Sequence, residues 1–129
     1  MRKNKHFFER NLMSELISWK NKKTKRPLII FGARQVGKTF LLKEFGLHFR
    51  QIVYIDFFRN SQFASIFEKD LSPKRILQEL ELLLETSIDV EQDLVIFDEI
   101  QYCSRALHSL KYFADEFPSG NIASAGSLL

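Results

Sequence analysis

Residues 28–39 read Leu28-Ile29-Ile30-Phe31-Gly32-Ala33-Arg34-Gln35-Val36-Gly37-Lys38-Thr39. The first four residues would be apolar on both faces of an extended chain, which is typical of a strand buried inside a parallel sheet. The segment bounded by glycines predicts a loop, and a helix is expected from about residue 38 to residue 45. Gly46 then stands where a helix C-terminal cap is expected. The stretch therefore predicts a strand, a loop and a helix in succession, the repeating unit of an α/β fold.

The loop also matches the pattern G-x-x-x-x-G-K-[ST] at every fixed position. In this pattern the backbone N–H groups wrap a phosphate, and the N-terminus of the next helix adds a positive partial charge. Lys38 is expected to reach the β- and γ-phosphates of a nucleoside triphosphate, and the Thr39 hydroxyl is expected to bind Mg²⁺. The predicted nucleotide-binding residues are Gly32, Ala33, Arg34, Gln35, Val36, Gly37, Lys38 and Thr39.

A second apolar run, residues 94–97, ends directly before two carboxylates, Asp98 and Glu99. Strands of a parallel sheet deliver such residues to their carboxyl ends, where ligands bind. We expect Asp98 to hold Mg²⁺ through a water and Glu99 to polarise the water that attacks the γ-phosphate. Glu99 and Lys38 are thus the predicted catalytic residues, and Thr39 and Asp98 are the predicted metal ligands. Surface carboxylates that merely cap a strand are the alternative interpretation.

The rest of the chain alternates between strand and helix patterns. Such alternation predicts an α/β fold with three layers, helices on both sides of a mostly parallel sheet. Residues 1–26 are predicted to be a basic helix and linker, and residues 27–129 the nucleotide-binding core. The further expected strands are 52–56, 94–97 and 122–125, and the further expected helices are 7–19, 61–69, one that starts at Ser72-Pro73, and 104–117.

Charge is distributed unevenly along the chain. Residues 1–26 hold nine Lys or Arg and two acidic residues, whereas the remainder holds ten basic and fourteen acidic residues. The basic N-terminal part suggests an encounter with nucleic acid or an anionic membrane, although no aromatic residues alternate with the lysines of 20–26. The other interpretation is a solvated basic helix and linker.

Composition excludes several classes of protein. With 129 residues, 45% of them apolar, the chain can form a core and is not intrinsically disordered. It has neither an apolar run long enough for a membrane span nor the apolar region of a secretory signal, so a cytoplasmic protein is expected. The single cysteine, Cys103, excludes an internal disulfide and a cysteine-based zinc site. Phe57 and Phe58 are expected to lie in the interior after their strand; an exposed patch is the alternative.

Other nucleotide-dependent classes fit less well. The chain has no Asn-Lys-x-Asp motif of the kind that reads guanine, and no G-x-G-x-x-G of the kind that binds dinucleotides. A small-molecule kinase does not need a hydrolytic Glu99 beside its metal-binding carboxylate. The pair Asp98-Glu99 therefore favours ATP hydrolysis coupled to work, with the choice between ATP and other purine triphosphates left open.

Together these motifs resemble the bacterial and archaeal AAA+ superfamily ATPases that have an AAA domain and a separate C-terminal domain. The resemblance extends from about Arg10 to Leu129. It implies a cytoplasmic Mg-dependent ATPase domain with strand order 2-3-4-1 and a fifth strand beside the first. The matching segments are 31–39, Tyr54-Ile55-Asp56, Phe97-Asp98-Glu99-Ile100-Gln101, Leu110-Lys111 and Gly126-Ser127.

The end of the chain departs from this family. Where the family has Thr-Gly-Ser, this chain has Ala125-Gly126-Ser127. The resemblance implies that Ser127, or alternatively Ser124, senses the γ-phosphate; both are otherwise ordinary strand serines. The fifth strand, a helical lid and an arginine that acts on a neighbouring nucleotide cannot be placed. The P-loop core is therefore expected to be truncated, with residues 28–31 as an open apolar edge that lowers solubility or stability.

Two further sets of residues have two interpretations each. Arg34 and Gln35 either touch the nucleotide or Gln101, or they face solvent. Asp56 is either a second acid near Mg²⁺ or a structural cap of its strand.

Three functions follow from these motifs. The first is Mg-dependent ATP binding and hydrolysis that drives an unidentified process, in self-association or with a larger protein partner. The second is a nucleotide-binding interaction module that does not hydrolyse ATP. The third is a remnant of a longer ATPase that has no activity of its own.

Overall fold

The computed structural model describes residues 2–32 and 37–127, with side chains from residue 10 onward. Four parallel strands form one sheet in the order β1-β4-β3-β2. This is the strand order that the family resemblance implies. The strands are β1 (Leu28–Gly32), β2 (Ile52–Asp56), β3 (Leu94–Asp98) and β4 (Ile122–Ser127).

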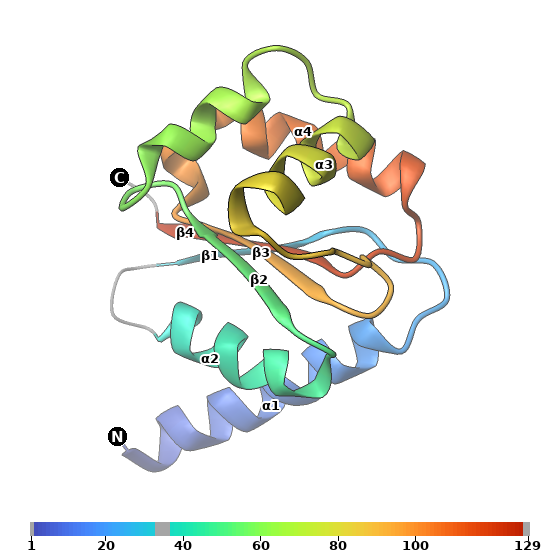
Figure 1. Cartoon of the computed structure of the whole chain (residues 1–129). Coiled ribbons are helices and arrows are strands. Elements are labelled where there is room, and N and C mark those ends of the chain that lie inside the picture. Colours follow the sequence, from blue (N-terminus) through green and yellow to red (C-terminus); the bar gives the residue numbers. More distant parts are fainter. Residues whose placement is uncertain (1, 33–36, 128–129) are drawn as a thin grey trace.

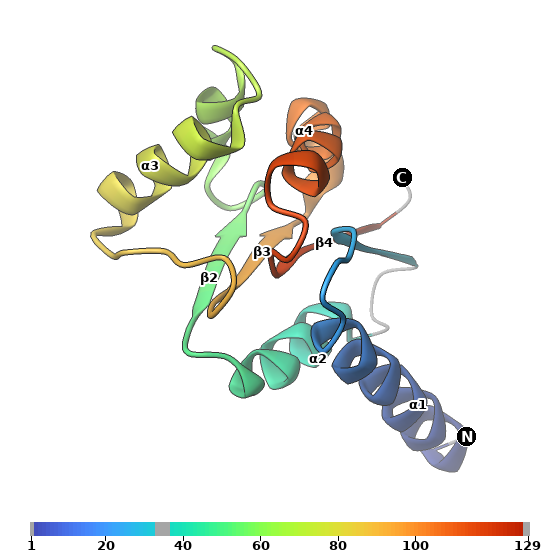
Figure 2. The same ribbon diagram turned by 90° about the vertical axis from the view of Figure 1, so that its right-hand side faces the viewer.

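Helices cover both faces of this sheet, which gives the expected three layers (Figures 1 and 2). One face carries α1 (Arg2–Lys20) and α2 (Lys38–Phe45). The other face carries α3 (Pro73–Leu84) and α4 (Ser104–Glu116). The short 3-10 helices are η1 (Gly46–His48), η2 (Ser61–Phe67) and η3 (Ile100–Tyr102).

Every residue of β3 is buried, as expected of a central strand. Because successive side chains point to opposite faces, Phe97 packs under α3 and α4, whereas Ile96 packs over α1 and α2. Phe97 lies within 6.0 Å, centroid to centroid, of Phe57, Phe67 and Phe113. This aromatic cluster fixes the end of β3 that carries Asp98.

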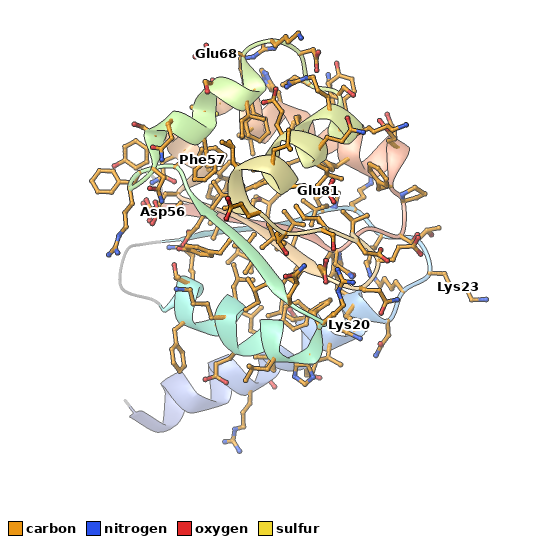
Figure 3. All side chains as sticks on the ribbon, in the orientation of Figure 1. Lys20, Lys23, Asp56, Phe57, Glu68 and Glu81 are labelled. Atoms are coloured by element: carbon orange, nitrogen blue, oxygen red, sulfur yellow. The ribbon has the colours of Figure 1, made fainter. Side chains whose placement is uncertain are left out.

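The N-terminal helix packs against the core. Leu16 and Trp19 are buried with Phe45 of α2, and the Trp19 indole N–H donates to the Arg26 carbonyl at 2.7 Å. The Lys25 ammonium lies 4.8 Å from the centroid of the Trp19 ring and donates a hydrogen bond to the Lys20 carbonyl. Figure 3 shows Lys20 and Lys23 at the opposite end of the sheet from Asp56. Nucleic-acid binding by residues 20–26 stays a prediction.

Two expectations need correction. The segment expected to be a helix over 61–69 is the 3-10 helix η2, which ends at Phe67. Phe57 is buried at 2% exposure, but Phe58 is 63% exposed, so the interior position expected for both holds for Phe57 alone. The chain turns directly after β2, and only the first of the two rings then faces the core.

The strand β1 lies at one edge of the sheet and pairs with β4 on one side. Its side chains Ile29 and Phe31 are 52% and 41% exposed. Within the described residues, the expected open apolar edge is therefore present. None of the described helices is long and apolar enough to cross a membrane.

Candidate functional site

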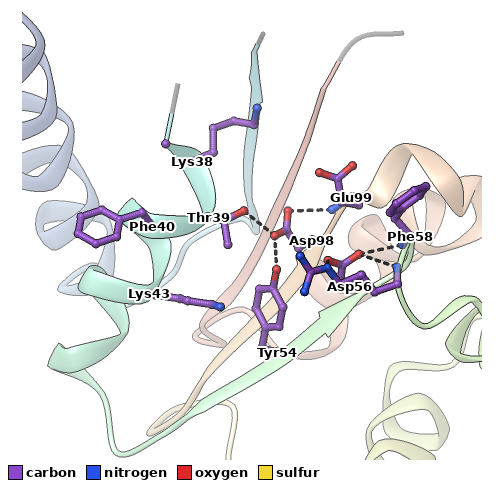
Figure 4. A pocket seen from close by; sticks show the side chains of 11 residues that line it. Lys38, Thr39, Phe40, Lys43, Tyr54, Asp56, Phe58, Asp98 and Glu99 are labelled. Atoms are coloured by element: carbon purple, nitrogen blue, oxygen red, sulfur yellow. Dashed lines mark hydrogen bonds and ion pairs between the residues drawn. The ribbon is translucent and has the colours of Figure 1, made fainter. Parts of the chain in front are cut away.

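A cavity of about 550 Å³ lies at the carboxyl ends of β2 and β3, next to the start of α2 (Figure 4). Its volume is within the range of ordinary small-molecule sites, about 300 to 1,000 Å³. The position agrees with the rule that ligands bind beyond the carboxyl ends of parallel strands. The cavity is lined by Gly37, Lys38, Thr39, Phe40, Lys43, Tyr54, Asp56, Phe58, Arg59, Asp98 and Glu99.

Thr39 and Asp98 meet at the floor of this cavity. The Thr39 hydroxyl donates a hydrogen bond of 2.7 Å to Asp98 Oδ2, although the residues are 59 positions apart. Asp98 is only 3% exposed at the end of β3, and its Oδ1 accepts the backbone N–H of Glu99 at 2.8 Å. The first turn of α2 and the end of β3 thus place two side-chain oxygen atoms side by side.

Tyr54 is a third member of this cluster. Its hydroxyl donates to Asp98 Oδ2, the oxygen that also accepts from Thr39. Burial, and then the hydrogen bond to Asp98, raise the pKa of Tyr54 well above its usual value, so it remains a donor. In the sequence, Tyr54 belongs to a predicted strand and to a segment that matches the family, without a predicted role in the site. The register that places Tyr54 opposite Ile96, beside Asp98, appears only in the folded sheet.

Lys38 lies at the mouth of the cavity. Its ammonium donates to the Gly32 carbonyl at 3.3 Å, so the side chain reaches back toward the end of β1. Gly37 precedes it with φ of 75° in the left-handed region, where glycine is favoured. The loop residues between these two glycines, Ala33, Arg34, Gln35 and Val36, lie outside the described residues, as do the contacts expected of Arg34 and Gln35.

Glu99 follows Asp98 in a left-handed conformation, with φ of 54°. Its carboxylate oxygen Oε2 accepts a 2.7 Å hydrogen bond from the Gln101 amide. The same amide nitrogen donates to Ser127 Oγ at 3.2 Å. Gln101 therefore lies between Glu99, which lines the cavity, and Ser127, which is not among the described lining residues.

Two other candidates have structural roles in this arrangement. The Ser124 hydroxyl is fully buried and donates to the Leu28 carbonyl at 3.0 Å, so it ties β4 to β1. Asp56 Oδ1 accepts the backbone N–H groups of Phe58 and Arg59, at 2.9 and 3.0 Å. Asp56 therefore caps the end of its strand, which is one of the two roles expected for it. Asp56 also lines the cavity.

The donor set suits a hard cation better than a soft one. Within the part of the chain that the structure describes, no three His, Cys, Asp or Glu residues gather as a metal centre. Mg²⁺ is commonly bound by one or two protein oxygens together with phosphates and waters. Thr39 and Asp98 offer two such protein oxygens. Cys103 lies apart from the cavity lining, and burial raises the pKa of its thiol, which keeps it unreactive.

The fold and the cavity define a P-loop nucleoside-triphosphatase core of the AAA type. The chain belongs to the AAA domain family, whose profile matches residues 24–129. A solved structure of PCH-2 from C. elegans superposes with a TM-score of 0.53 at 17% identity. The match covers 93% of this chain and 36% of that chain, and at this identity it shows the fold alone. No curated protein sequence matches the chain.

Proposed function

We propose that this chain binds ATP with Mg²⁺ in the cavity beside α2 and hydrolyses it. The observation that carries the proposal is the hydrogen bond between Thr39 and Asp98. The phosphate-loop motif, which contains Thr39, and the Asp98-Glu99 pair at the end of β3 meet there through the Thr39 hydroxyl and the Asp98 carboxylate. AAA-family membership supports nucleotide binding in general.

The phosphates would lie along the loop from Gly32 to Gly37, held by the backbone N–H groups of Gly32, Ala33, Arg34, Gln35, Val36 and Gly37. Lys38 would exchange its contact with the Gly32 carbonyl for the β- and γ-phosphate oxygens. Ser127, at the end of β4, would donate its hydroxyl to the γ-phosphate. The positive end of α2 would contribute to the same field.

Thr39 and Asp98 would hold Mg²⁺, Thr39 directly and Asp98 through a water. When bound, the cation neutralises charge on the phosphates and lowers the barrier to their transfer. Both oxygens are fixed before any ligand arrives, because Tyr54 and the Glu99 backbone N–H restrain the Asp98 carboxylate. Such restraint reduces the reorganisation needed on binding.

Glu99 would orient the attacking water and accept its proton, since its carboxylate lines the cavity next to the Asp98 position. The work that hydrolysis drives would involve a second copy of this chain or a larger protein. The exposed apolar side chains of β1, Ile29 and Phe31, are a surface on which such a partner would bury area. A cytoplasmic location belongs to this proposal as well.

The experiment measures binding and turnover separately. Purified chain is titrated with Mg-ATP and Mg-GTP by calorimetry, and phosphate release is followed with a coupled assay. We expect Lys38→Ala to abolish nucleotide binding and Glu99→Gln to retain binding while phosphate release falls at least about 100-fold. Stronger binding of Mg-GTP than of Mg-ATP would contradict the choice of ATP.

Matched controls are available in the chain. Lys74 is an exposed lysine of α3, and Lys74→Ala is expected to bind as the wild type does. Glu85 shares the left-handed conformation of Glu99, with φ of 52°, and is exposed at the end of α3, so Glu85→Gln controls for backbone effects. If wild type binds ATP but releases no more phosphate than Glu99→Gln, the chain is a nucleotide-binding module and the hydrolytic proposal is wrong.

A further inference from the structure

The side chain of Gln101 connects two parts of the site that belong to different strands. Its Nε2 donates to Glu99 Oε2 at 2.7 Å and to Ser127 Oγ at 3.2 Å. Its Oε1 accepts the backbone N–H of Ser127 at 3.3 Å. Both ends of the amide are therefore used. The nitrogen bonds Glu99 and Ser127, and the oxygen bonds Ser127 alone.

The backbone explains how Gln101 returns to Glu99. Glu99 adopts φ of 54°, and the 3-10 helix η3 follows at once, closed by the Tyr102 N–H on the Glu99 carbonyl at 3.1 Å. Ile100, fully buried, anchors this turn in the core. A positive φ at a residue other than glycine is unfavourable and persists where the surroundings enforce it. The turn thus holds Gln101 beside the Glu99 carboxylate.

Gly126 leaves the room that the Gln101 amide occupies. A Cβ atom at position 126 would lie 2.5 Å from Gln101 Oε1 and 2.5 Å from the Phe31 ring, closer than real Cβ contacts. A side chain at position 126 would therefore displace the Gln101 amide and the Phe31 ring from the positions they hold here. This contact links the Gln101 amide to β4 by packing as well as by hydrogen bonds.

We propose that Gln101 is a positioning residue that couples Glu99 to the end of β4 at Ser127. The proposal rests on the proposed ATP hydrolysis, in which Glu99 orients the water and Ser127 faces the γ-phosphate. Occupation of the Ser127 end by a γ-phosphate then acts on Glu99 through one amide group. A nucleoside diphosphate lacks that phosphate, so it does not act on Glu99 through Gln101.

The test replaces the amide by a side chain of similar length that makes no such hydrogen bonds. Gln101→Met is expected to lower kcat for ATP about tenfold, part of the 10²- to 10⁴-fold that a general base contributes. The Kd for Mg-ATP is expected to stay within about threefold, because the contacts of Lys38 and Thr39 are untouched. Gln78→Met, on the exposed face of α3, is the matched control.

Two double variants separate positioning from a merely structural contact. In a Glu99→Gln background, Gln101→Met is expected to lower phosphate release no further, because the positioned carboxylate is gone. Ser127→Ala combined with Gln101→Met is expected to lower kcat by less than the product of the two single effects, because without Gln101 the loss of Ser127 no longer acts on Glu99. A Gln101→Met variant with kcat within twofold of wild type would overturn the proposal. So would a loss of turnover matched by an equal loss of ATP affinity or of folded protein.

A readout without turnover keeps the two proposals distinguishable. In ¹⁵N-labelled protein without nucleotide, Glu99→Gln is expected to shift the Ser127 backbone amide resonance. In a Gln101→Met background the same substitution is expected to shift it less than half as far. If the wild-type chain does not hydrolyse ATP, the proposed function fails while this measurement still decides the coupling. An undiminished shift in the Gln101→Met background overturns the coupling.

Discussion

Tyr54 and Asp98 come from neighbouring strands, and the Tyr54 hydroxyl donates to the same carboxylate oxygen that the Thr39 hydroxyl contacts. Three chain segments thus converge on one buried carboxylate: the middle of β2, the end of β3 and the start of α2. The Lys43 ammonium lies 4.5 Å from the centre of the Tyr54 ring and holds its outer face. The orientation of Asp98 therefore depends on a residue outside both nucleotide-binding motifs.

Replacing Tyr54 by phenylalanine is expected to lower the affinity of the site for Mg²⁺. The hydroxyl restrains Asp98, and loss of such an outer partner commonly lowers metal affinity by about 10- to 100-fold. We expect Tyr54→Phe to raise the Mg²⁺ concentration for half-maximal ATP binding about tenfold, measured by calorimetry at fixed ATP. Tyr112→Phe, on the surface of α4, is the control. An unchanged Mg²⁺ dependence would show that Thr39 and the Glu99 backbone N–H are enough to hold Asp98.

Acid is expected to destabilise the fold through Asp93, which is fully buried. Burial acts to raise the pKa of Asp93, but hydrogen bonds from Arg50, the Asp89 N–H and Gln51 outweigh it, so the pKa lies below its usual value. A carboxyl with a lowered native pKa stabilises the fold above its unfolded pKa, about 3.9, and this contribution is lost as pH falls through the native pKa.

The measurement is urea unfolding between pH 7 and pH 3. Asp93→Asn is expected to be less stable than the wild type at pH 7, and the gap is expected to narrow below about pH 4. Asp70→Asn removes a partly exposed partner of Arg75 and is expected to have a small effect at pH 7. A pH-independent gap for Asp93→Asn would exclude this linkage.

The aromatic cluster around Phe97 is expected to carry much of the stability. Phe97 is fully buried, and its ring lies 5.6 Å from the Phe67 ring, centroid to centroid. Phe97→Ala is expected to lower the free energy of unfolding by about 3–5 kcal/mol. That is a large share of the roughly 5–15 kcal/mol available to a domain. Urea unfolding followed by circular dichroism measures it, with the exposed Phe58→Ala expected to change stability by less than about 0.5 kcal/mol.

The edge strand β1 is expected to promote self-association. Ile29 is 52% exposed on a strand whose outer backbone groups are available to another chain. We expect Ile29→Lys to raise the concentration at which light scattering appears, because a charge on an edge strand opposes strand pairing. Leu82→Lys is the control, because Leu82 is an even more exposed apolar residue, at 78%, but lies on α3 and not on the edge strand. Equal effects of the two variants would assign the association to general hydrophobicity.

Much of the architecture follows from local patterns. The four strands and the helix at 38–45 were predictable because each strand is a short apolar run and the phosphate-loop pattern fixes strand, loop and helix together. The strand order was predictable only from the family resemblance. The meeting of Thr39 and Asp98 follows from that topology, since parallel strands end at one edge. The catalytic role of Glu99 stays a prediction.

Other features depend on packing that no local pattern expresses. Tyr54 reaches Asp98 through the register of β2 and β3, and Gln101 reaches Ser127 across 26 residues. The segment of η2 has apolar residues at spacings that suit either helix type, and its tight turns are set by Phe63 and Phe67, which are buried in the core. Contacts at such a distance along the chain become visible only when the sheet is assembled.

The joint burial of Trp19 and Phe45 gives α1 a mechanical consequence. Their rings lie 6.2 Å apart, centroid to centroid, so α1 and α2 share one core. The helix α2 also begins with Lys38 and Thr39, the residues that would respond to a bound phosphate. With 19 residues, α1 is a rod of roughly 28 Å, so a small rotation of α2 is amplified at its far end. If the shared core keeps the two helices together, the far end of α1 moves whenever the start of α2 responds to a phosphate.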